Sequence, residues 1–321
     1  MGIRNSITGS LKAHKATKKA QAEASSASTT VLRTSLLEGT VGVITGADSG
    51  IGAAAVHIFA AAGAQVIYAI DIKDRNLFNY DAEVKAKGLK TDVFGVTVDI
   101  SDDKEVEALV RRVIKEQGKL DWFFANAGVI DWEALPTTAP AVLDRVINVN
   151  VRGTFNCVQW ATRALVTTSE AKPTAGGSIV VTTSLAGSSG SWGTPAYTMS
   201  KHAAIGLVRS TAANLIKAGN TGIRINGVAP GPTLTPIGQN NLTLSTMSGQ
   251  ARMAVLSASS KITDESLSWS CTPSEIAQTA LFLISDQASG INGQNVIVDK
   301  GLSEAPHDMG GLLFKPVFEP L

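Results

Sequence analysis

From residue 37 onward, short apolar runs rich in Val and Ile alternate with longer amphipathic stretches. The apolar runs are predicted to be strands at residues 41–45, 65–70, 93–98, 120–126, 178–183, 224–228 and 295–298. Helical patterns lie between most of them, for example at 51–62, 103–117 and 196–217. Near-continuous apolar strands separated by helices are typical of a parallel sheet that is covered on both faces. The pattern therefore predicts an α/β fold, a doubly wound, Rossmann-like parallel sheet in a single domain.

Both ends of the chain differ from this body, which we place at residues 36–301. Residues 1–35 carry six basic residues and one acid, so they predict a mobile basic extension, and their composition also suits an organelle transit peptide. Residues 232–272 show no strand period and follow a strand directly, so they are predicted to be a substrate loop. The apolar, proline-interrupted tail 302–321 is expected either to dock on a neighbouring subunit or the active site, or to be a loose end.

The composition argues against a nucleic-acid-binding, disulfide-rich, metal-binding or membrane-spanning protein. Hydrophobic residues make up 44% of the chain, and 28 basic against 27 acidic residues give a formal charge of +1, which argues against nucleic acid as a partner. Two distant cysteines provide neither a disulfide framework nor a metal site. No apolar run approaches the roughly 18 residues of a membrane span. We therefore expect a cytoplasmic protein with no membrane partner. The alternative is an organelle location, if residues 1–35 act as a transit peptide.

A glycine-rich turn follows the first strand and opens an Ala-rich helix. It reads Gly46-Ala47-Asp48-Ser49-Gly50-Ile51-Gly52. Glycines let the backbone approach a pyrophosphate, and the N–H groups of the helix N-terminus can bind it. A glycine turn alone is weak support, because any tight turn needs glycine, but this one stands between a strand and a helix. The turn therefore predicts a dinucleotide site rather than a plain structural turn.

Asp71 ends the second strand, about 20 residues after the glycines. An acid at this point accepts hydrogen bonds from the ribose hydroxyls and repels a 2′-phosphate, so NAD is favoured over NADP. The nearby Lys73 and Arg75 weigh in the other direction. An ordinary solvated acid at the end of a strand is the alternative interpretation of Asp71.

Further motifs follow in order along the chain. They are Thr45-Gly46-x-x-x-Gly50-Ile51-Gly52, Asp99-Ile100, Asn126-Ala127-Gly128, Asn148-Val149-Asn150-Val151-Arg152-Gly153, Ser184, Tyr197-x-x-x-Lys201 and Pro230-Gly231-Pro232-Thr233-Leu234-Thr235. In this order, and on these elements, they resemble the classical short-chain dehydrogenase/reductase family over residues 37–301.

The resemblance implies a site, an activity and an assembly. The catalytic residues would be Asn150, Ser184, Tyr197 and Lys201. The cofactor-binding residues would be Gly46, Ser49, Gly50, Ile51, Gly52, Asp71, Asp99, Ile100, Asn126, Ala127, Gly128, Tyr197, Lys201, Pro230, Thr233 and Thr235. By the same resemblance, Asn150 holds a water in a proton relay and Thr235 holds the nicotinamide carboxamide. The helices at about 151–168 and 196–218 would assemble a homotetramer or homodimer.

The spacing of Tyr197 and Lys201 has a physical reason. Positions i and i+4 share one face of a helix, so both side chains can enter one cleft. A free phenol has a pKa near 10, and a nearby ammonium is expected to lower it. Tyr197 would then exchange a proton with a substrate oxygen while hydride moves to or from the nicotinamide, and Ser184 would hydrogen-bond the same oxygen.

This chemistry predicts an oxidoreductase that interconverts a secondary alcohol and a ketone. Trp192 and the apolar residues of the segment 234–270 favour a hydrophobic substrate, although a core position for Trp192 is nearly as well supported. His202 and the two cysteines are interpreted as structural. Two alternatives stay open: an enzyme on the same scaffold without net redox, such as an epimerase, dehydratase or cyclase, and a non-catalytic dinucleotide-binding protein.

Overall fold

The computed structural model describes residues 35–219, 221–238 and 270–304. It divides the chain into two units between Ser35 and Leu36, and the second unit is the one described below. The predicted basic extension up to residue 34, the part of the substrate loop at 239–269, and the C-terminal tail from residue 305 lie outside the described residues. Among the described helices, none has the length and apolar character needed to cross a membrane.

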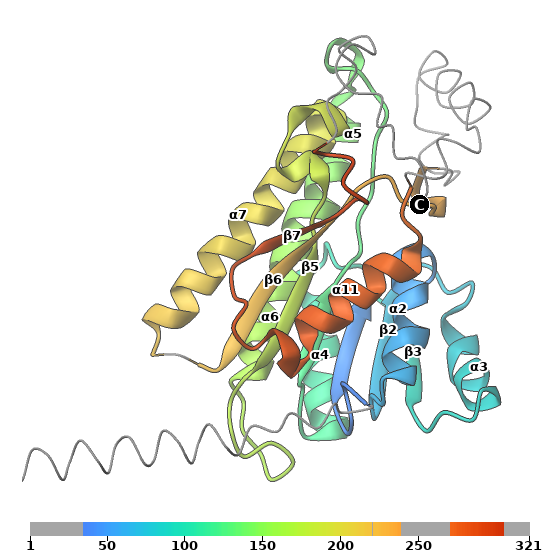
Figure 1. Cartoon of the computed structure of the whole chain (residues 1–321), viewed down its shortest axis with the longest axis vertical. Coiled ribbons are helices and arrows are strands. Elements are labelled where there is room, and N and C mark those ends of the chain that lie inside the picture. The colour runs from blue at the N-terminus through green and yellow to red at the C-terminus, as the bar shows by residue number, and fades with distance from the viewer. Residues whose placement is uncertain (1–34, 220, 239–269, 305–321) are drawn as a thin grey trace, which may run out of the picture. The chain divides into compact units, whose positions relative to one another are not determined.

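One parallel sheet of seven strands organises this unit (Figure 1). Its spatial order is β3 (Asp92–Thr97), β2 (Val66–Asp71), β1 (Val41–Thr45), β4 (Trp122–Ala125), β5 (Gly177–Thr182), β6 (Ile223–Pro230) and β7 (Asn295–Val298). The predicted doubly wound, Rossmann-like fold is therefore confirmed. The strand order reverses between β1 and β4, and ligands of such sheets bind beyond the carboxyl ends of the strands at this switch point.

Helices cover both faces of the sheet and create two separate cores. On one face lie α2 (Gly50–Ala61), α3 (Tyr80–Ala86) and α11 (Pro273–Ile284), and α2 and α11 run side by side there (Figure 1). On the other face lie α4 (Asp103–Gln117), α6 (Thr154–Leu165) and α7 (Pro195–Lys217). Successive strand residues point to opposite faces, so Phe123 belongs to the second core and Phe124 to the first. This double burial explains why the central strands β1, β2, β4 and β5 are apolar without alternation.

The segment before α6 differs from the predicted helix at 151–168. After α5 (Pro140–Ile147), the chain forms a π-helical turn, η3 (Asn148–Gly153), and the regular helix begins only at Thr154. Gly153 packs so closely that a β-carbon there would lie 2.7 Å from Ile100 Cγ1. Single π-helical turns within helices frequently occur at functional sites, and this one contains Asn150.

Candidate active site

Tyr197 lies in the first turn of α7, where a threonine cap sets the helix start. The Thr194 hydroxyl accepts a 3.4 Å hydrogen bond from the Tyr197 N–H and donates a 2.7 Å bond to the carboxylate of Asp131. Asp131 is buried in the segment after β4. Side-chain caps of this kind stabilise a helix by about 1 kcal/mol. The direction in which Tyr197 leaves the helix therefore depends on a carboxylate from a distant part of the chain.

Lys201 stands one helical turn after Tyr197 and shares its face. Its ammonium is 5.7 Å from the centroid of the Tyr197 ring and donates a 2.8 Å hydrogen bond to the Thr182 carbonyl at the end of β5. The side chain is buried, and burial lowers the pKa of Lys201 to about 8. The structure thus brings the two side chains together as their spacing requires.

Ser184, two residues after the end of β5, adjoins the Tyr197 phenol. It caps the short helical turn η4 (Leu185–Gly187), and its hydroxyl accepts a 3.1 Å bond from the Ala186 N–H. Burial raises the pKa of Tyr197, and the hydrogen bond with Ser184 lowers it by a smaller amount. The expected lowering by the Lys201 ammonium is therefore wrong in its net direction in this structure, because enclosing the phenol disfavours its charged form.

Asn150 braces the centre of the site. Its side-chain NH₂ donates to the Val129 carbonyl at 2.8 Å and to the Ser200 hydroxyl at 3.0 Å, while its carbonyl oxygen accepts from the Val129 N–H at 2.8 Å. Both donor hydrogens are thus used, and one acceptor position of the oxygen is left. A β-carbon on Gly128 would lie 3.3 Å from Asn150 Oδ1 and 3.7 Å from Lys201 Nζ. Only glycine leaves this space between the two side chains open, and the water-relay role of Asn150 stays a prediction.

The glycine turn forms a cradle whose glycines have distinct roles. Gly46 and Gly50 have φ of 68° and 56°, which favours glycine, whereas Gly52 lacks room, since a β-carbon there would lie 2.1 Å from the Gly46 carbonyl oxygen. Ser49 is the N-cap of α2 and its side chain makes no cap bond to the helix. Thr235 lies over the turn, because a β-carbon on Gly50 would be 3.2 Å from its side chain. A bare backbone at a helix N-terminus fits the pyrophosphate of a dinucleotide.

Asp71 ends β2 beside this cradle. Its carboxylate accepts 3.2 Å bonds from the Asp48 N–H and the Lys73 N–H. Burial raises the pKa of Asp71, and these backbone bonds lower it. The sequence pattern did not single out Asp48. In the structure Asp48 is 1% exposed, and its carboxylate accepts a 2.7 Å hydrogen bond from Arg75 Nε. The sequence feature that could have indicated Asp48 is that it is a single acidic residue among the small residues of the glycine turn.

The remaining predicted residues brace the strand ends around the cradle. Thr45 Oγ1 accepts from the N–H groups of Asn126 and Ala127, both at 2.9 Å, and the Asn126 side chain donates to the Thr45 carbonyl at 3.0 Å. The Asp99 carboxylate accepts from the Ser101 hydroxyl at 2.7 Å.

Ile100, Pro230 and Thr233 make no contact in the cradle that the structure shows. The Ile100 side chain is buried under Gly153. Pro230 ends β6, and the Thr233 hydroxyl donates to the Gly231 carbonyl at 2.9 Å. Their cofactor contacts stay predictions.

Comparisons with known proteins decide the family. The family model described as enoyl-(acyl carrier protein) reductase matches residues 46–303. Short-chain dehydrogenase reductase 4 from Arabidopsis thaliana is 35% identical over 269 residues, which are 84% of this chain and 84% of that protein. The chain belongs to the short-chain dehydrogenase/reductase family. Members of this family bind a nicotinamide dinucleotide, and the cradle described above has the shape for one.

Two further members of the family widen the comparison. (+)-cis,trans-Nepetalactol synthase NEPS2 from Nepeta racemosa is 35% identical over 289 residues, which are 88% of this chain and 97% of that protein. A short-chain dehydrogenase from Mycobacterium paratuberculosis bound to NAD superimposes with a TM-score of 0.70 at 30% identity, over 84% of this chain and 100% of that chain. Reductases, a synthase and an NAD complex thus share this scaffold.

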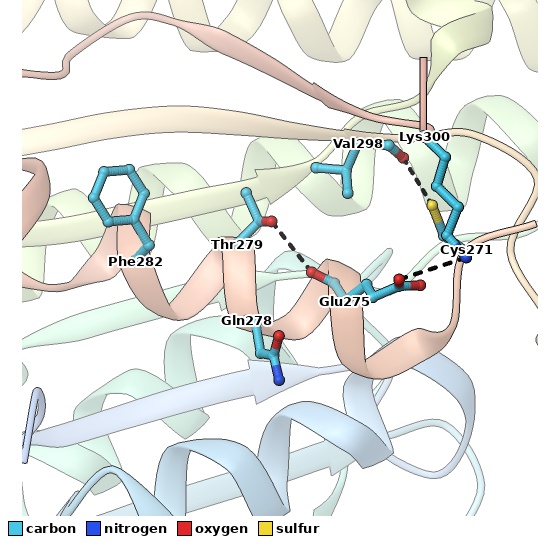
Figure 2. A pocket seen from close by; sticks show the side chains of 7 residues that line it. All are labelled: Cys271, Glu275, Gln278, Thr279, Phe282, Val298 and Lys300. Atoms are coloured by element: carbon cyan, nitrogen blue, oxygen red, sulfur yellow. Dashed lines mark hydrogen bonds and ion pairs between the residues drawn. The ribbon is translucent and has the colours of Figure 1, made fainter. Parts of the chain in front are cut away.

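An open hollow of about 440 Å³ lies over α11, apart from the residues of the family's site (Figure 2). It is lined by Cys271, Glu275, Gln278, Thr279, Phe282, Val298 and Lys300. In Figure 2, Lys300 pairs with Glu275 at 3.5 Å, and the Cys271 thiol bonds to the Val298 carbonyl at 3.4 Å. Both cysteines are buried, and burial raises the pKa of each thiol. His202 is exposed and bonded to the Thr198 carbonyl, so neither the cysteines nor His202 join the site.

Proposed function

We propose that this protein is an NAD(H)-dependent oxidoreductase that interconverts a secondary alcohol and a ketone. The observation that carries the proposal is the meeting of three side chains: Ser184 adjoins the Tyr197 phenol closely enough to lower its pKa, and the Lys201 ammonium lies 5.7 Å from the tyrosine ring. A proton donor, a second hydroxyl and a cation in one enclosed place suit acid–base catalysis at a substrate oxygen. The glycine cradle beside them supports the accompanying hydride chemistry.

Each side chain has a defined task in this proposal. The raised pKa of Tyr197 keeps its phenol protonated at neutral pH, which is the state that a donor to a ketone oxygen needs. In the opposite direction, Tyr197 takes the proton of the alcohol. Ser184 orients the substrate oxygen, and Lys201 supplies positive charge beside the tyrosine ring. The nicotinamide dinucleotide, when bound, accepts or supplies the hydride.

Asp71 supports NAD as the preferred cofactor. Its carboxylate closes β2 next to the glycine turn, where a ribose is bound in folds of this type. A second negative charge from a 2′-phosphate would be repelled there. Arg75, which weighed toward NADP in the sequence, is paired with Asp48 instead.

The surroundings favour a hydrophobic substrate. Trp192 is half-buried in η5 (Gly190–Trp192), between Ser184 and Tyr197 along the chain. Leu234 is exposed where the chain leaves β6 for the substrate loop. The other apolar residues on which this expectation rests, Met247, Met253, Leu256 and Trp269, lie outside the described residues.

A second candidate function is a reaction without net redox. The relationship to a nepetalactol synthase favours it, because that protein's name indicates a synthase on the same scaffold. The presence of Ser184, Tyr197 and Lys201 together favours the redox reaction instead. The two candidates differ in one observable, namely whether nicotinamide absorbance changes as product forms.

We also propose that the protein is a homotetramer or homodimer. Phe155 on α6 is 50% exposed, and Met199 on α7 is exposed as well. A hollow of about 220 Å³ lies between these helices and is lined by Phe155 and Leu207 among others. Large apolar side chains on adjacent helices suit contact with another subunit.

The test is Tyr197→Phe, assayed with a panel of hydrophobic alcohols and ketones by nicotinamide absorbance. We expect kcat to fall by at least about a hundredfold, since a positioned acid–base group is removed. The NADH dissociation constant should change by less than about threefold, because one neutral hydroxyl is lost. Tyr68→Phe is the matched control: it also loses a tyrosine hydroxyl bond, to Glu116 at 2.6 Å, but on the face of α4.

Normal turnover by Tyr197→Phe would refute the assigned role. Product formation without a change in nicotinamide absorbance would move the assignment to the reaction without net redox. Failure of the wild-type protein to bind NADH or NADPH would remove the dinucleotide function itself.

A further inference from the structure

The carboxylate of Asp48 ties the glycine turn to the segment after β2. It is 1% exposed and accepts a 2.7 Å bond from Arg75 Nε and another of 2.7 Å from the Asn76 N–H. The Asn76 side chain also donates to the Asp48 carbonyl at 3.0 Å. Both oxygens of this carboxylate accept hydrogen bonds from a segment 27 and 28 residues away, so the shape of the glycine turn alone does not explain a charged side chain here.

Asp48 also adjoins Asp71, whose carboxylate is expected to bind the adenosine ribose. The backbone N–H of Asp48 donates a 3.2 Å hydrogen bond to Asp71 Oδ2, which joins the two acidic residues. Burial is the main cause of the raised pKa of Asp71, and the negative charge of Asp48 adds to it. This end of the cradle therefore holds two carboxylates whose fields reinforce each other. A third anion at this point is disfavoured.

Arg75 is the group that could reverse this preference. A guanidinium is the side chain that binds phosphate best, through paired N–H donors. Arg75 and Asp71 both contact Asp48, and the Arg75 side chain is 54% exposed, so it has room to change its orientation. In the structure, however, its Nε is taken by the buried Asp48 carboxylate.

We propose that Asp48 is a specificity-determining residue that secures the preference for NAD by holding Arg75 away from a 2′-phosphate. Asp71 then repels the phosphate, and Asp48 removes the cation that would compensate for it. The inference rests on the proposed function, because it requires that a dinucleotide binds at the glycine turn and that NAD is preferred there. It assigns to the Asp48–Arg75 pair a share of the preference that the acid at the end of β2 is expected to carry.

The test measures dissociation constants of NADH and NADPH by calorimetric titration, with no turnover needed. Asp48→Asn keeps the side-chain shape and an acceptor for the Asn76 N–H, but loses the charge that holds Arg75. We expect the affinity for NADPH to rise about tenfold relative to that for NADH. Asp48→Ser, which also keeps an acceptor without a charge, gives the same measurement if the asparagine variant does not fold.

Paired variants identify the cation. Asp48→Asn combined with Arg75→Ala should lose the gain, whereas Asp48→Asn combined with Lys73→Ala should keep it, since Arg75 is the one of these two cations that pairs with the Asp48 carboxylate. Arg75→Ala alone should leave the NADH to NADPH ratio within about threefold of the wild type, because the charge of Arg75 is already paired with the Asp48 carboxylate.

An unchanged ratio in the folded Asp48 variants overturns the inference, and so does a gain that survives the loss of Arg75. Asp71→Ala separates this from the proposed function. If wild-type protein binds NADH and Asp71→Ala weakens NADH more than NADPH, the ribose site stands even where the Asp48 variants fail. If the wild type binds neither dinucleotide, the proposed function fails with it.

Discussion

Gly52→Ala is expected to damage the dinucleotide cradle and the fold together. Gly52 lies in the first turn of α2, directly against the backbone of the glycine turn. An added β-carbon would stand 2.1 Å from the Gly46 carbonyl oxygen, 2.7 Å from its carbonyl carbon and 2.9 Å from Ala47 Cα. Non-bonded heavy atoms normally stay about 3.5 Å apart, so the turn and the helix would have to separate by more than about 1 Å.

The turn has little freedom to give way. The Ala47 carbonyl accepts a 2.6 Å bond from the buried Tyr80 hydroxyl, and the Ala47 N–H donates to the Ile70 carbonyl at 3.0 Å. Overpacking of this kind costs about 1–3 kcal/mol, and a rigid backbone neighbour favours the upper end. Alanine regains about 1 kcal/mol of helix propensity over glycine, which does not offset the clash. We expect a net loss of about 2 kcal/mol in the free energy of unfolding.

Urea unfolding and NADH titration measure the two consequences. The matched control is Gly206→Ala, also in a helix but with nothing within 4 Å of the added β-carbon, in α7. It should gain about 0.5–1 kcal/mol through helix propensity alone. Equal unfolding free energies for wild type and Gly52→Ala, with unchanged NADH affinity, would show that the close approach at Gly52 is not a constraint.

Two further predictions concern buried charge and assembly. The pKa of Lys201 is about 8 in the folded protein and 10.5 in the free side chain, so between these pH values the unfolded chain binds this proton more tightly than the folded protein does. The contribution of Lys201 to the free energy of unfolding is therefore smallest below pH 8 and grows as the pH rises to about 10.5. The difference in unfolding free energy between wild type and Lys201→Met should therefore increase over this range by on the order of 3 kcal/mol, as urea melts at each pH would measure, and a flat difference would contradict the buried cation. Phe155→Asp, at an apolar position that is 50% exposed, should reduce the sedimentation mass of the assembly, and an unaltered mass would place the subunit contact elsewhere.

The fold followed closely from the sequence, because its determinants are local. The apolar runs at 41–45 and 295–298 coincide with β1 and β7, and the amphipathic pattern at 103–117 coincides with α4. The i, i+4 spacing of Tyr197 and Lys201 likewise required only a helix to bring them together. Such patterns extend over a few residues, because the spacing of apolar residues along the chain matches the repeat of a helix or a strand.

Other features depended on contacts that no local pattern contains. The regular helix expected from about residue 151 begins as a π-helical turn, and Gly153 in that turn packs closely against Ile100, which follows β3. Asp131 and Thr194, 63 positions apart, together fix the start of α7. Neither pair could be inferred from composition or spacing, because each forms only when separate elements pack.

The sequence by itself determined that this chain would build a parallel sheet, a glycine cradle and a tyrosine beside a lysine, since each depends on the local order of residues. Only the tertiary structure decided the electrostatics of these groups. The pKa of Tyr197 is raised rather than lowered, and Arg75 is taken up by Asp48, 27 residues away. The physical reason is that desolvation and ion pairing depend on everything that surrounds a charge, and those surroundings exist only once the elements have packed.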